Sequence, residues 1–319
     1  MQTSPPTGPP DRATVVVLGG TGFVGRTVCP ALAAAGYDVR AIGRRAAEPP
    51  AGSALIRLDA VHAAPGELAA ALRAAEPVAV VNAAGTYWAV GDRRPTPDEL
   101  AAGNLGLVQR LVEELALLDR APRLIHLGSA YEYGPQPPGT LLTEDTPELP
   151  QNDYGQTKLG ATRVVRAAVE AGRLDAVTLR LTTTVGPYPP PASLFGKVAY
   201  ELAAEPARVR LPALSGERDF VDVRDVAAAV LAAIRAPEVP PLLNIASTAI
   251  VPVTEAVDLL IKIAGLAVGV ERQAPEPGRA DAVGSQRISV DAARTYLGWE
   301  PQYTLADSLG ALWASVREG

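Results

Sequence analysis

Short apolar runs rich in β-branched residues alternate along this chain with longer Ala- and Leu-rich stretches of helical spacing. Continuous apolar runs are typical of parallel strands that are covered by helices on both faces. Strands are predicted at Thr14–Leu18, Asp38–Ile42, Ala54–Leu58, Val78–Asn82, Arg123–Leu127, Ala176–Leu181 and Leu242–Ile245. Helices are predicted at Gly25–Ala35, Pro65–Ala75, Pro97–Leu118, Tyr154–Ala171 and Ser193–Ala204. The repeated strand–helix order predicts an α/β fold with a doubly wound parallel sheet.

Glycine and proline gather at two places, Gly186–Pro191 and Pro275–Gly278, which predicts loops leading into a smaller C-terminal lobe. We assign residues 14–186 to a nucleotide-binding domain, to which residues 220–248 return. Residues 187–219 and 249–319 then form a substrate-binding lobe. Residues 1–13 are Pro-rich and polar, which predicts a disordered tail.

The stretch Pro97–Leu118 has more apolar positions than one helix stripe on a sheet requires. The surplus predicts a second buried face, either a subunit contact or a surface covered by the rest of the chain.

The composition excludes several classes of function. The formal net charge of -6 shows no excess of positive charge that would attract nucleic acid or an anionic membrane. A single cysteine, Cys29, excludes an internal disulfide, and two histidines argue against a zinc site. No run approaches the length of a membrane span. We therefore expect a cytoplasmic protein without a metal.

The first predicted strand runs directly into a Gly-x-x-Gly-x-x-Gly turn and a helix. Gly19 allows the sharp turn, Gly22 lets the backbone approach a pyrophosphate, and Gly25 lets the helix pack closely on the strand. The N–H groups at the helix start then face the phosphates. Together with Thr21, Phe23 and Val24, these glycines are the predicted dinucleotide loop.

The end of the second strand indicates which dinucleotide binds. An acid there would bind the ribose of NAD, whereas arginine accommodates the 2′-phosphate of NADP. The chain has Gly43 at that position, followed by Arg44 and Arg45, which favours NADP(H); a solvated turn is the alternative. After the third strand, Asp59 and Ala60 are placed to meet the adenine, although Asp59 could instead cap the next helix.

Tyr154 and Lys158 are one helical turn apart and share a helix face. A phenol with a pKa of about 10 is a poor acid–base catalyst at neutral pH, but a neighbouring ammonium and the positive nicotinamide of an oxidised cofactor together stabilise the phenolate. A shift of about 3 units corresponds to about 4 kcal/mol. Upstream, Ser129 ends the fifth strand, where its hydroxyl could polarise a carbonyl, and Asn104 lies in the long helix. The alternative for Tyr154 and Lys158 is that they form an ordinary i,i+4 pair on the surface of the helix and take no part in catalysis.

These features resemble the extended short-chain dehydrogenase/reductase family, in its nucleotide-sugar epimerase, dehydratase and ketoreductase branch. The resemblance extends from Thr14 to the C-terminus. Its motifs are the Gly-rich loop, Asp59, Asn82-Ala-Ala-Gly85, Asn104, Ser129 to Gly134, Tyr154 with Lys158, Val185-Gly186-Pro187, Arg218 to Asp225, and Leu297-Gly-Trp299.

The resemblance implies a Rossmann domain with a smaller substrate lobe, and Ser129, Tyr154 and Lys158 as catalytic residues. Ala83 and Ala84 are expected beside the cofactor with Asn104. Arg218 is expected to meet a substrate diphosphate. The family also implies a homodimer formed through the two helices that match Pro97–Leu118 and Tyr154–Ala171.

The chain departs from the family at positions that narrow the reaction. Dehydratases of the family have an acid two residues after the catalytic Ser or Thr, and epimerase/reductases of the 3,5 type have a cysteine there. Here the residue is Tyr131, and Glu132 is expected to point the other way in an extended segment. Of the reactions in the family, those that transfer a hydride at one carbon remain for this chain, namely 4-keto reduction and 4-epimerisation.

Two further departures concern the diphosphate. The family's asparagine is Thr183 here, and the arginine of its later loop is Glu276. Arg279 or Arg287 is expected to compensate, and Tyr131 and Thr183 join Ser129 and Arg218 as candidate substrate contacts.

We expect an NADPH-dependent reductase of a nucleotide-activated keto-deoxysugar, with a dTDP-linked 4-keto-6-deoxyhexose as the substrate. The enzyme alternatives are a nucleotide-sugar 4-epimerase and a reductase of a ketone or aldehyde without a nucleotide. The non-enzyme alternative is an NADP(H)-binding regulatory protein, against which the intact Ser–Tyr–Lys set argues.

Overall fold

A seven-stranded parallel sheet forms the centre of the molecule. The structure is a computed structural model that describes residues 13–44, 48–87, 93–137, 139–204, 208–211, 214–266, 269–272 and 286–318. Across the sheet the strands are β11 (Leu242–Ile245), β7 (Ala176–Leu181), β5 (Arg123–Ser129), β4 (Ala79–Asn82), β1 (Thr14–Leu18), β2 (Asp38–Gly43) and β3 (Ser53–Arg57). Every pairing in this sheet is parallel.

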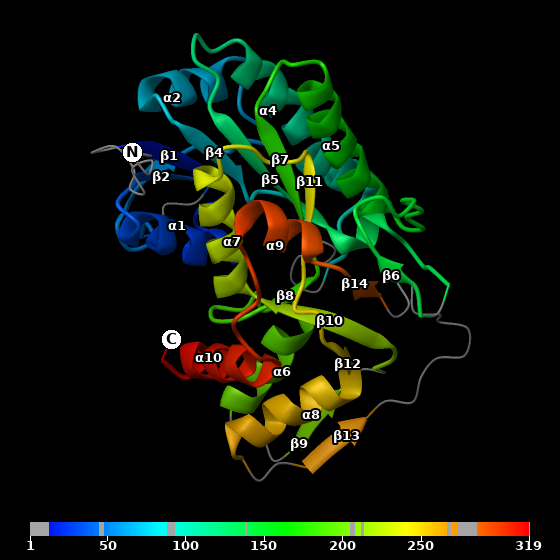
Figure 1. The fold of residues 1–319 in the computed structure, drawn as a ribbon. Coiled ribbons are helices and arrows are strands. Elements are labelled where there is room, and N and C mark those ends of the chain that lie inside the picture. Colours follow the sequence, from blue (N-terminus) through cyan, green and yellow to red (C-terminus); the bar gives the residue numbers. More distant parts are fainter. Residues whose placement is uncertain are drawn as a thin grey trace, which may run out of the picture.

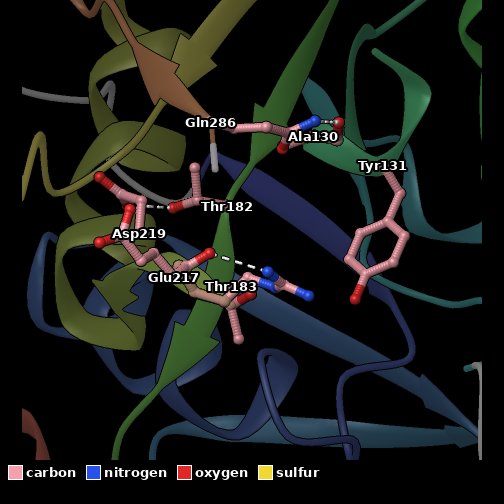
Figure 2. Close-up of a pocket in the computed structure, with 8 residues that line it drawn as sticks. Ala130, Tyr131, Thr182, Thr183, Glu217, Asp219 and Gln286 are labelled. Atoms are coloured by element: carbon pink, nitrogen blue, oxygen red, sulfur yellow. Dashed lines mark hydrogen bonds between the residues drawn. The ribbon is translucent and has the colours of Figure 1, made fainter. Parts of the chain in front are cut away.

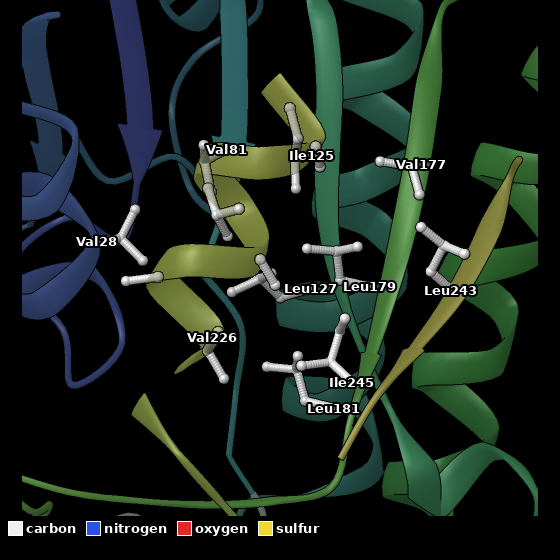
Figure 3. Close-up of a cluster of buried hydrophobic side chains, with 14 of the residues drawn as sticks. Val28, Val81, Ile125, Leu127, Val177, Leu179, Leu181, Val226, Leu243 and Ile245 are labelled. Carbon is white, nitrogen blue, oxygen red and sulfur yellow. The ribbon is translucent and has the colours of Figure 1, made fainter. Parts of the chain in front are cut away.

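Helices cover both faces of the sheet (Figure 1). One face carries α1 (Gly25–Ala34), α7 (Val223–Arg235) and α9 (Asp291–Leu297), which share one apolar cluster with the strands. Figure 3 shows part of this cluster, with Val28 from α1 and Val226 from α7 beside the sheet. The other face carries α2 (Glu67–Ala75), α4 (Leu107–Ala116) and α5 (Asp153–Glu170) in a second cluster. The predicted doubly wound α/β sheet is confirmed.

The strand order reverses at β1, because the chain runs outward to β2 and β3 and then returns to β4 on the other side. Ligands of such sheets bind at this switch point, in the crevice at the carboxyl ends of the strands. The segments that follow β1 and β4 are in close contact at this point, because a Cβ added to Gly19 would lie 2.8 Å from the carbonyl carbon of Ala83.

The remaining elements form a smaller lobe, seen below the sheet in Figure 1. Its apolar cluster joins α6 (Leu194–Ala203), α8 (Val253–Ala264) and α10 (Leu305–Glu318). Short strands that the sequence pattern did not predict complete it: β8 (Thr183–Val185), β10 (Glu217–Asp222) and β12 (Ile250–Pro252) form one sheet, and β9 (Arg208–Leu211) pairs with β13 (Gly269–Arg272). Strand β6 (Leu141–Leu142) pairs with β14 (Arg287–Ile288).

The predicted loop at Gly186–Pro191 separates β8 from α6. The predicted loop at Pro275–Gly278 lies outside the described residues, and so does the predicted tail apart from Ala13. The residue boundaries of the two predicted domains stay a prediction. None of the described helices is long and apolar enough to span a bilayer.

The predicted helix Pro97–Leu118 is three segments rather than one. Thr96 caps α3 (Pro97–Leu100) in a capping box with Glu99, a π-helical turn η1 follows at Ala101–Gly106, and α4 completes the run. Most of the surplus apolar residues pack within the chain, because α4 contacts both α2 and α5 as well as the sheet; Leu117 remains exposed. A second buried face therefore exists without a partner subunit, and the predicted homodimer stays a prediction.

Candidate active site

The Gly-rich turn between β1 and α1 has a backbone that only glycine accommodates. Gly19 has a φ of 72°, and its carbonyl accepts the Gly22 N–H at 2.9 Å. A Cβ at Gly25 would collide with the Gly19 carbonyl oxygen. The first turn of α1 therefore lies directly against the end of β1, as predicted for Gly25. A turn of this form leaves a cradle of backbone N–H groups that fits a dinucleotide pyrophosphate.

At the end of β2, Gly43 lies against the side chain of Thr21. A Cβ added to Gly43 would be 2.6 Å from Thr21 Oγ1. Packing against the Gly-rich turn is thus one reason for a glycine at this position. The expected choice of cofactor is a second reason. Arg44 follows with an exposed side chain, and Arg45 lies outside the described residues.

Asp59 closes a tight turn after β3. Its Oδ1 accepts the N–H groups of Val61 at 3.1 Å and His62 at 3.3 Å. It does not cap the next helix, because Gly66 occupies that position before α2, so the helix-cap alternative is wrong. Ala60 is buried beside it.

Tyr154 and Ser129 come together from different elements. Ser129 is the last residue of β5, and Tyr154 lies in the first turn of α5, which Asn152 caps by accepting the Gly155 N–H at 2.8 Å. The Tyr154 and Ser129 side chains share a hydrogen bond. Lys158 follows one turn later, where its buried Nζ donates to the Leu127 carbonyl at 2.5 Å. The three predicted catalytic residues thus converge at the carboxyl end of the sheet.

Desolvation is the largest influence on the ionisation of this set in the protein without cofactor. Burial raises the pKa of Tyr154 well above its ordinary value, with a smaller contribution from Tyr87, and the hydrogen bond with Ser129 offsets only part of this. Burial also lowers the pKa of Lys158 to about 8. The expected lowering of the Tyr154 pKa includes the positive nicotinamide of the oxidised cofactor, so it stays a prediction.

The π-helical turn η1 orients Asn104. Its Oδ1 accepts the Thr86 N–H at 2.9 Å, and its Nδ2 donates to the Thr86 carbonyl at 3.2 Å and to Thr157 Oγ1 at 3.1 Å. Inserted π turns are frequent at functional sites because they re-aim a side chain within a helix. Asn104 thereby joins the segment after β4, which holds Ala83 and Ala84, to the first turns of α5.

A pocket opens beside Ser129, lined by Ala130, Tyr131, Thr182, Thr183, Glu217, Arg218, Asp219 and Gln286. Figure 2 shows Tyr131 across this pocket from Thr183 and Asp219. Three predicted substrate contacts, Tyr131, Thr183 and Arg218, are therefore brought together with the catalytic set. Glu276 and Arg279 lie outside the described residues, and Arg287 is exposed in β14.

Gln286 and Tyr87 are site residues that the sequence did not indicate. Gln286 is buried, and its Nε2 donates to the carbonyls of Ala130 at 3.3 Å and Gly134 at 3.0 Å. No sequence pattern marks it. Tyr87 stands edge-on to Tyr154, with ring centroids 6.2 Å apart. The sequence could have indicated Tyr87 as a site residue, because it follows the carboxyl end of β4 by only a few residues.

Glu132 points away from the pocket, but the predicted reason is wrong. Ala130–Glu132 is a turn of 3₁₀ helix, not an extended segment. The Glu132 carboxylate is fully buried and receives the Ser129 N–H at 2.7 Å and Arg180 Nε at 2.9 Å. The capping interaction with Ser129 turns the side chain inward.

Within the described part of the chain, no group of His, Cys, Asp and Glu residues could hold a metal ion. Cys29 is buried, and burial raises the pKa of its thiol to about 12, so it is not a nucleophile at neutral pH.

Comparisons with known proteins agree with this geometry. The sequence profile of the NAD dependent epimerase/dehydratase family matches residues 15–246. The chain is 37% identical over 318 residues to a dTDP-6-deoxy-L-talose 4-dehydrogenase (NAD(P)(+)) of Kitasatospora kifunensis, which covers 98% of each chain.

Two solved structures show a similar fold. The UDP-glucuronic acid 4-epimerase of Bacillus cereus, in complex with UDP-glucuronic acid and NAD, superposes with a TM-score of 0.80 at 20% identity, over 96% of this chain and 99% of that one. The RMD protein of Pseudomonas aeruginosa, complexed with NADPH, superposes with a TM-score of 0.76 at 22% identity, over 96% and 99%. Both cover the Rossmann-like sheet and the smaller lobe.

Proposed function

Since the chain belongs to the NAD dependent epimerase/dehydratase family and is an NAD(P)-dependent oxidoreductase-type enzyme that modifies nucleotide sugars, we propose that it reduces a nucleotide-linked keto-deoxysugar. We propose a dTDP-linked 4-keto-6-deoxyhexose as the substrate. The Kitasatospora relative, a dTDP-6-deoxy-L-talose 4-dehydrogenase, supports this choice, because oxidation at carbon 4 and reduction of the 4-ketone are one reaction in opposite directions.

The observation that carries the proposal is the geometry at Tyr154. Its side chain shares a hydrogen bond with Ser129 at the carboxyl end of the sheet, and its ring stands edge-on to Tyr131, which lines the adjacent pocket. A protonated tyrosine beside a serine can give its proton to a ketone oxygen, as reduction requires. Because a 4-epimerase uses the same tyrosine in both directions, the cofactor assay below separates the two reactions.

The lack of a dehydratase acid supports the same reaction. Tyr131 stands where that acid would be, and the carboxylate of Glu132 is turned into the protein toward Arg180. Asp219 lines the pocket, but its Oδ1 is engaged by the Thr182 hydroxyl at 2.6 Å and the Ser247 N–H at 2.8 Å. At the position where the family's dehydratases have their acid, therefore, this chain has no carboxylate to remove a proton next to the ketone.

The residues of this chain have distinct roles in the proposed step. A nicotinamide held by the Gly-rich turn would supply the hydride. Ser129 and Tyr154 would both bind the substrate oxygen, and Tyr154 would donate its proton as the alkoxide develops. Lys158 would hold the cofactor ribose and support the return of the tyrosine to its protonated form.

We further propose that NADP(H) is preferred over NAD(H). The exposed Arg44 at the end of β2, and Gly43 in place of an acid, support this preference. Known relatives bind NAD or NADPH, so the family membership alone gives only an NAD(P) cofactor.

We also propose a homodimer formed through α4 and α5, on the strength of the family resemblance. Size measurement in solution tests it, and a monomer would contradict it. The expected cytoplasmic location stays a prediction.

A cofactor assay tests the proposed reaction. Protein purified without added cofactor is expected to be largely free of NAD⁺. Absorbance of NADPH should then fall one-for-one with added dTDP-4-keto-6-deoxyhexose. Tightly held NAD⁺, together with interconversion of two sugar nucleotides and no net loss of NADPH, would establish an epimerase instead.

A further inference from the structure

A buried carboxylate lies directly behind the catalytic serine. Glu132 is fully buried, and each of its oxygens has a strong donor: the main-chain N–H of Ser129 at 2.7 Å and Arg180 Nε at 2.9 Å. The side chain therefore joins the end of β5 to the middle of β7. Neither contact involves substrate or cofactor.

Arg180 is itself held in place. It is fully buried, its Nη2 donates to Glu148 Oε1 at 2.8 Å, and its guanidinium lies 4.3 Å from the ring centroid of Tyr133. The Tyr133 hydroxyl in turn lies 2.8 Å from both the Thr143 carbonyl oxygen and Asn244 Oδ1, and its single proton is donated to one of these acceptors at a time. Because Arg180 is held on several sides, Glu132 has one orientation.

Gly128 provides the space for this carboxylate. A Cβ at Gly128 would lie 2.8 Å from Glu132 Oε1, so any side chain there would displace the carboxylate. A buried ion pair generally adds little stability over an apolar pair of the same size. The arrangement is therefore better explained by what it does for the adjacent site than by its contribution to folding.

Glu132 and Lys158 both bind the last residues of β5. Lys158 Nζ donates to the Leu127 carbonyl at 2.5 Å, and two residues later the Ser129 N–H donates to Glu132 Oε1 at 2.7 Å. The negative charge of Glu132 accordingly raises the pKa of Lys158, opposing the larger effect of burial, and adds to the raised pKa of Tyr154. The other ionisable group near Lys158 on β5 is His126, which burial keeps neutral. Glu132 is thus the carboxylate that counters the desolvation of Lys158.

We propose that Glu132 is a positioning residue: fixed by Arg180, its carboxylate holds the Ser129 main chain in register with Tyr154 and places a negative charge at the stretch of β5 that Lys158 binds. The inference rests on the proposed function only in taking Ser129, Tyr154 and Lys158 as the reacting set. It assigns Glu132 no contact with substrate.

The ionisation of Lys158 can be measured without any substrate, because the chain has only three lysines, Lys158, Lys197 and Lys262. In protein labelled with ¹³C at lysine Cε, Lys197→Arg and Lys262→Arg assign the three resonances. Wild-type Lys158 is expected to titrate at about pH 8. In Glu132→Gln, which keeps an oxygen for the Ser129 N–H but removes the charge, its midpoint should fall by about one pH unit.

Glu148→Gln is the matched control. It removes a carboxylate from the same guanidinium, but Glu148 has no contact with Ser129 and also lies near Arg163 and Arg166. Its Lys158 midpoint should equal that of the wild type. An unchanged midpoint in folded Glu132→Gln, or equal shifts in both variants, would overturn the proposal.

Should Glu132→Gln fail to fold, Glu132→Asp provides the test. The shorter side chain keeps its charge but does not span from the Ser129 N–H to Arg180. We expect kcat to fall roughly 10-fold while the Kd for NADPH is unchanged, as for a displaced Ser129. Wild-type kcat in this variant would overturn the proposal. The lysine titration needs no turnover, so it gives its answer even if the wild type reduces no keto-sugar.

Discussion

The ring of Tyr131 stands edge-on to the ring of Tyr154, with centroids 5.6 Å apart and planes at 86°. Tyr87 contacts Tyr154 in the same way at 6.2 Å. Tyr87 keeps 48% of its surface exposed, so it packs against Tyr154 from the solvent side. The proton donor is therefore oriented by two aromatic neighbours, and edge-to-face pairs of this kind add about 0.5–1.5 kcal/mol each.

Replacement of Tyr154 by Phe should remove the proton transfer and leave the ring contacts in place. We expect turnover to fall by roughly 10²–10⁴-fold, with the Kd for NADPH nearly unchanged. Tyr131→Phe is the control, because it removes a neighbouring hydroxyl but keeps the ring that packs on Tyr154. Steady-state kinetics and cofactor titration measure both, and a wild-type kcat in Tyr154→Phe would refute the mechanism.

Replacement of Arg44 and Arg45 by Ala should erase the preference for NADPH over NADH. A charge-assisted contact to the 2′-phosphate is worth roughly 1–3 kcal/mol, which the double variant loses for NADPH alone. Arg57→Ala is the control, since Arg57 is an exposed arginine at the end of the neighbouring strand β3. Calorimetric titration of both cofactors decides the matter, and equal or tighter binding of NADH by the wild type would contradict the preference.

Cofactor affinity should depend on the ionisation of Lys158, whose pKa is lowered to about 8, mainly by burial. Below that pH the ammonium is present and can donate to the ribose; above it the amine is neutral and binds more weakly. The Kd for NADPH should therefore be flat below about pH 8 and rise as the pH increases further. Fluorescence titrations from about pH 7 to 9.5 measure this. In Lys158→Met the Kd should be higher and independent of pH, and the same pH dependence in that variant would exclude Lys158 as its source.

Gly25→Ala should disrupt the dinucleotide loop, because the new methyl group would collide with the Gly19 carbonyl oxygen. We expect a loss of roughly 1–3 kcal/mol in the free energy of unfolding and much weaker NADPH binding. Gly310→Ala is the control: nothing lies within 4 Å of its added Cβ in α10, so it should stabilise the protein by about 0.5–1 kcal/mol. Thermal unfolding and cofactor titration compare the two. A Gly25→Ala protein that binds NADPH normally would refute the tight packing of the loop.

The sequence determined the features that depend on neighbours along the chain. Apolar runs and helical spacing predicted the strands of the sheet and the helices that cover it, because burial imposes those periods locally. The turn from Gly19 to Gly25 and the spacing of Tyr154 and Lys158 were equally local. The break within Pro97–Leu118 was not predicted, since a π turn at Ala101–Gly106 has no pattern of its own and is held by the contacts of Asn104 with Thr86 and Thr157.

Only the tertiary structure decided how the site is held and ionised. Glu132 was expected in an extended segment until the 3₁₀ turn and Arg180 on β7 were found to hold it, and the extent to which burial raises the pKa of Tyr154 in the protein without cofactor depends on its tertiary surroundings. Gly43 likewise reads as a missing acid until Thr21 is found against it. Each of these contacts joins residues far apart in the chain. Their distances are set by strand order and helix packing, and desolvation depends on everything that surrounds a group, so neither is written in the local pattern.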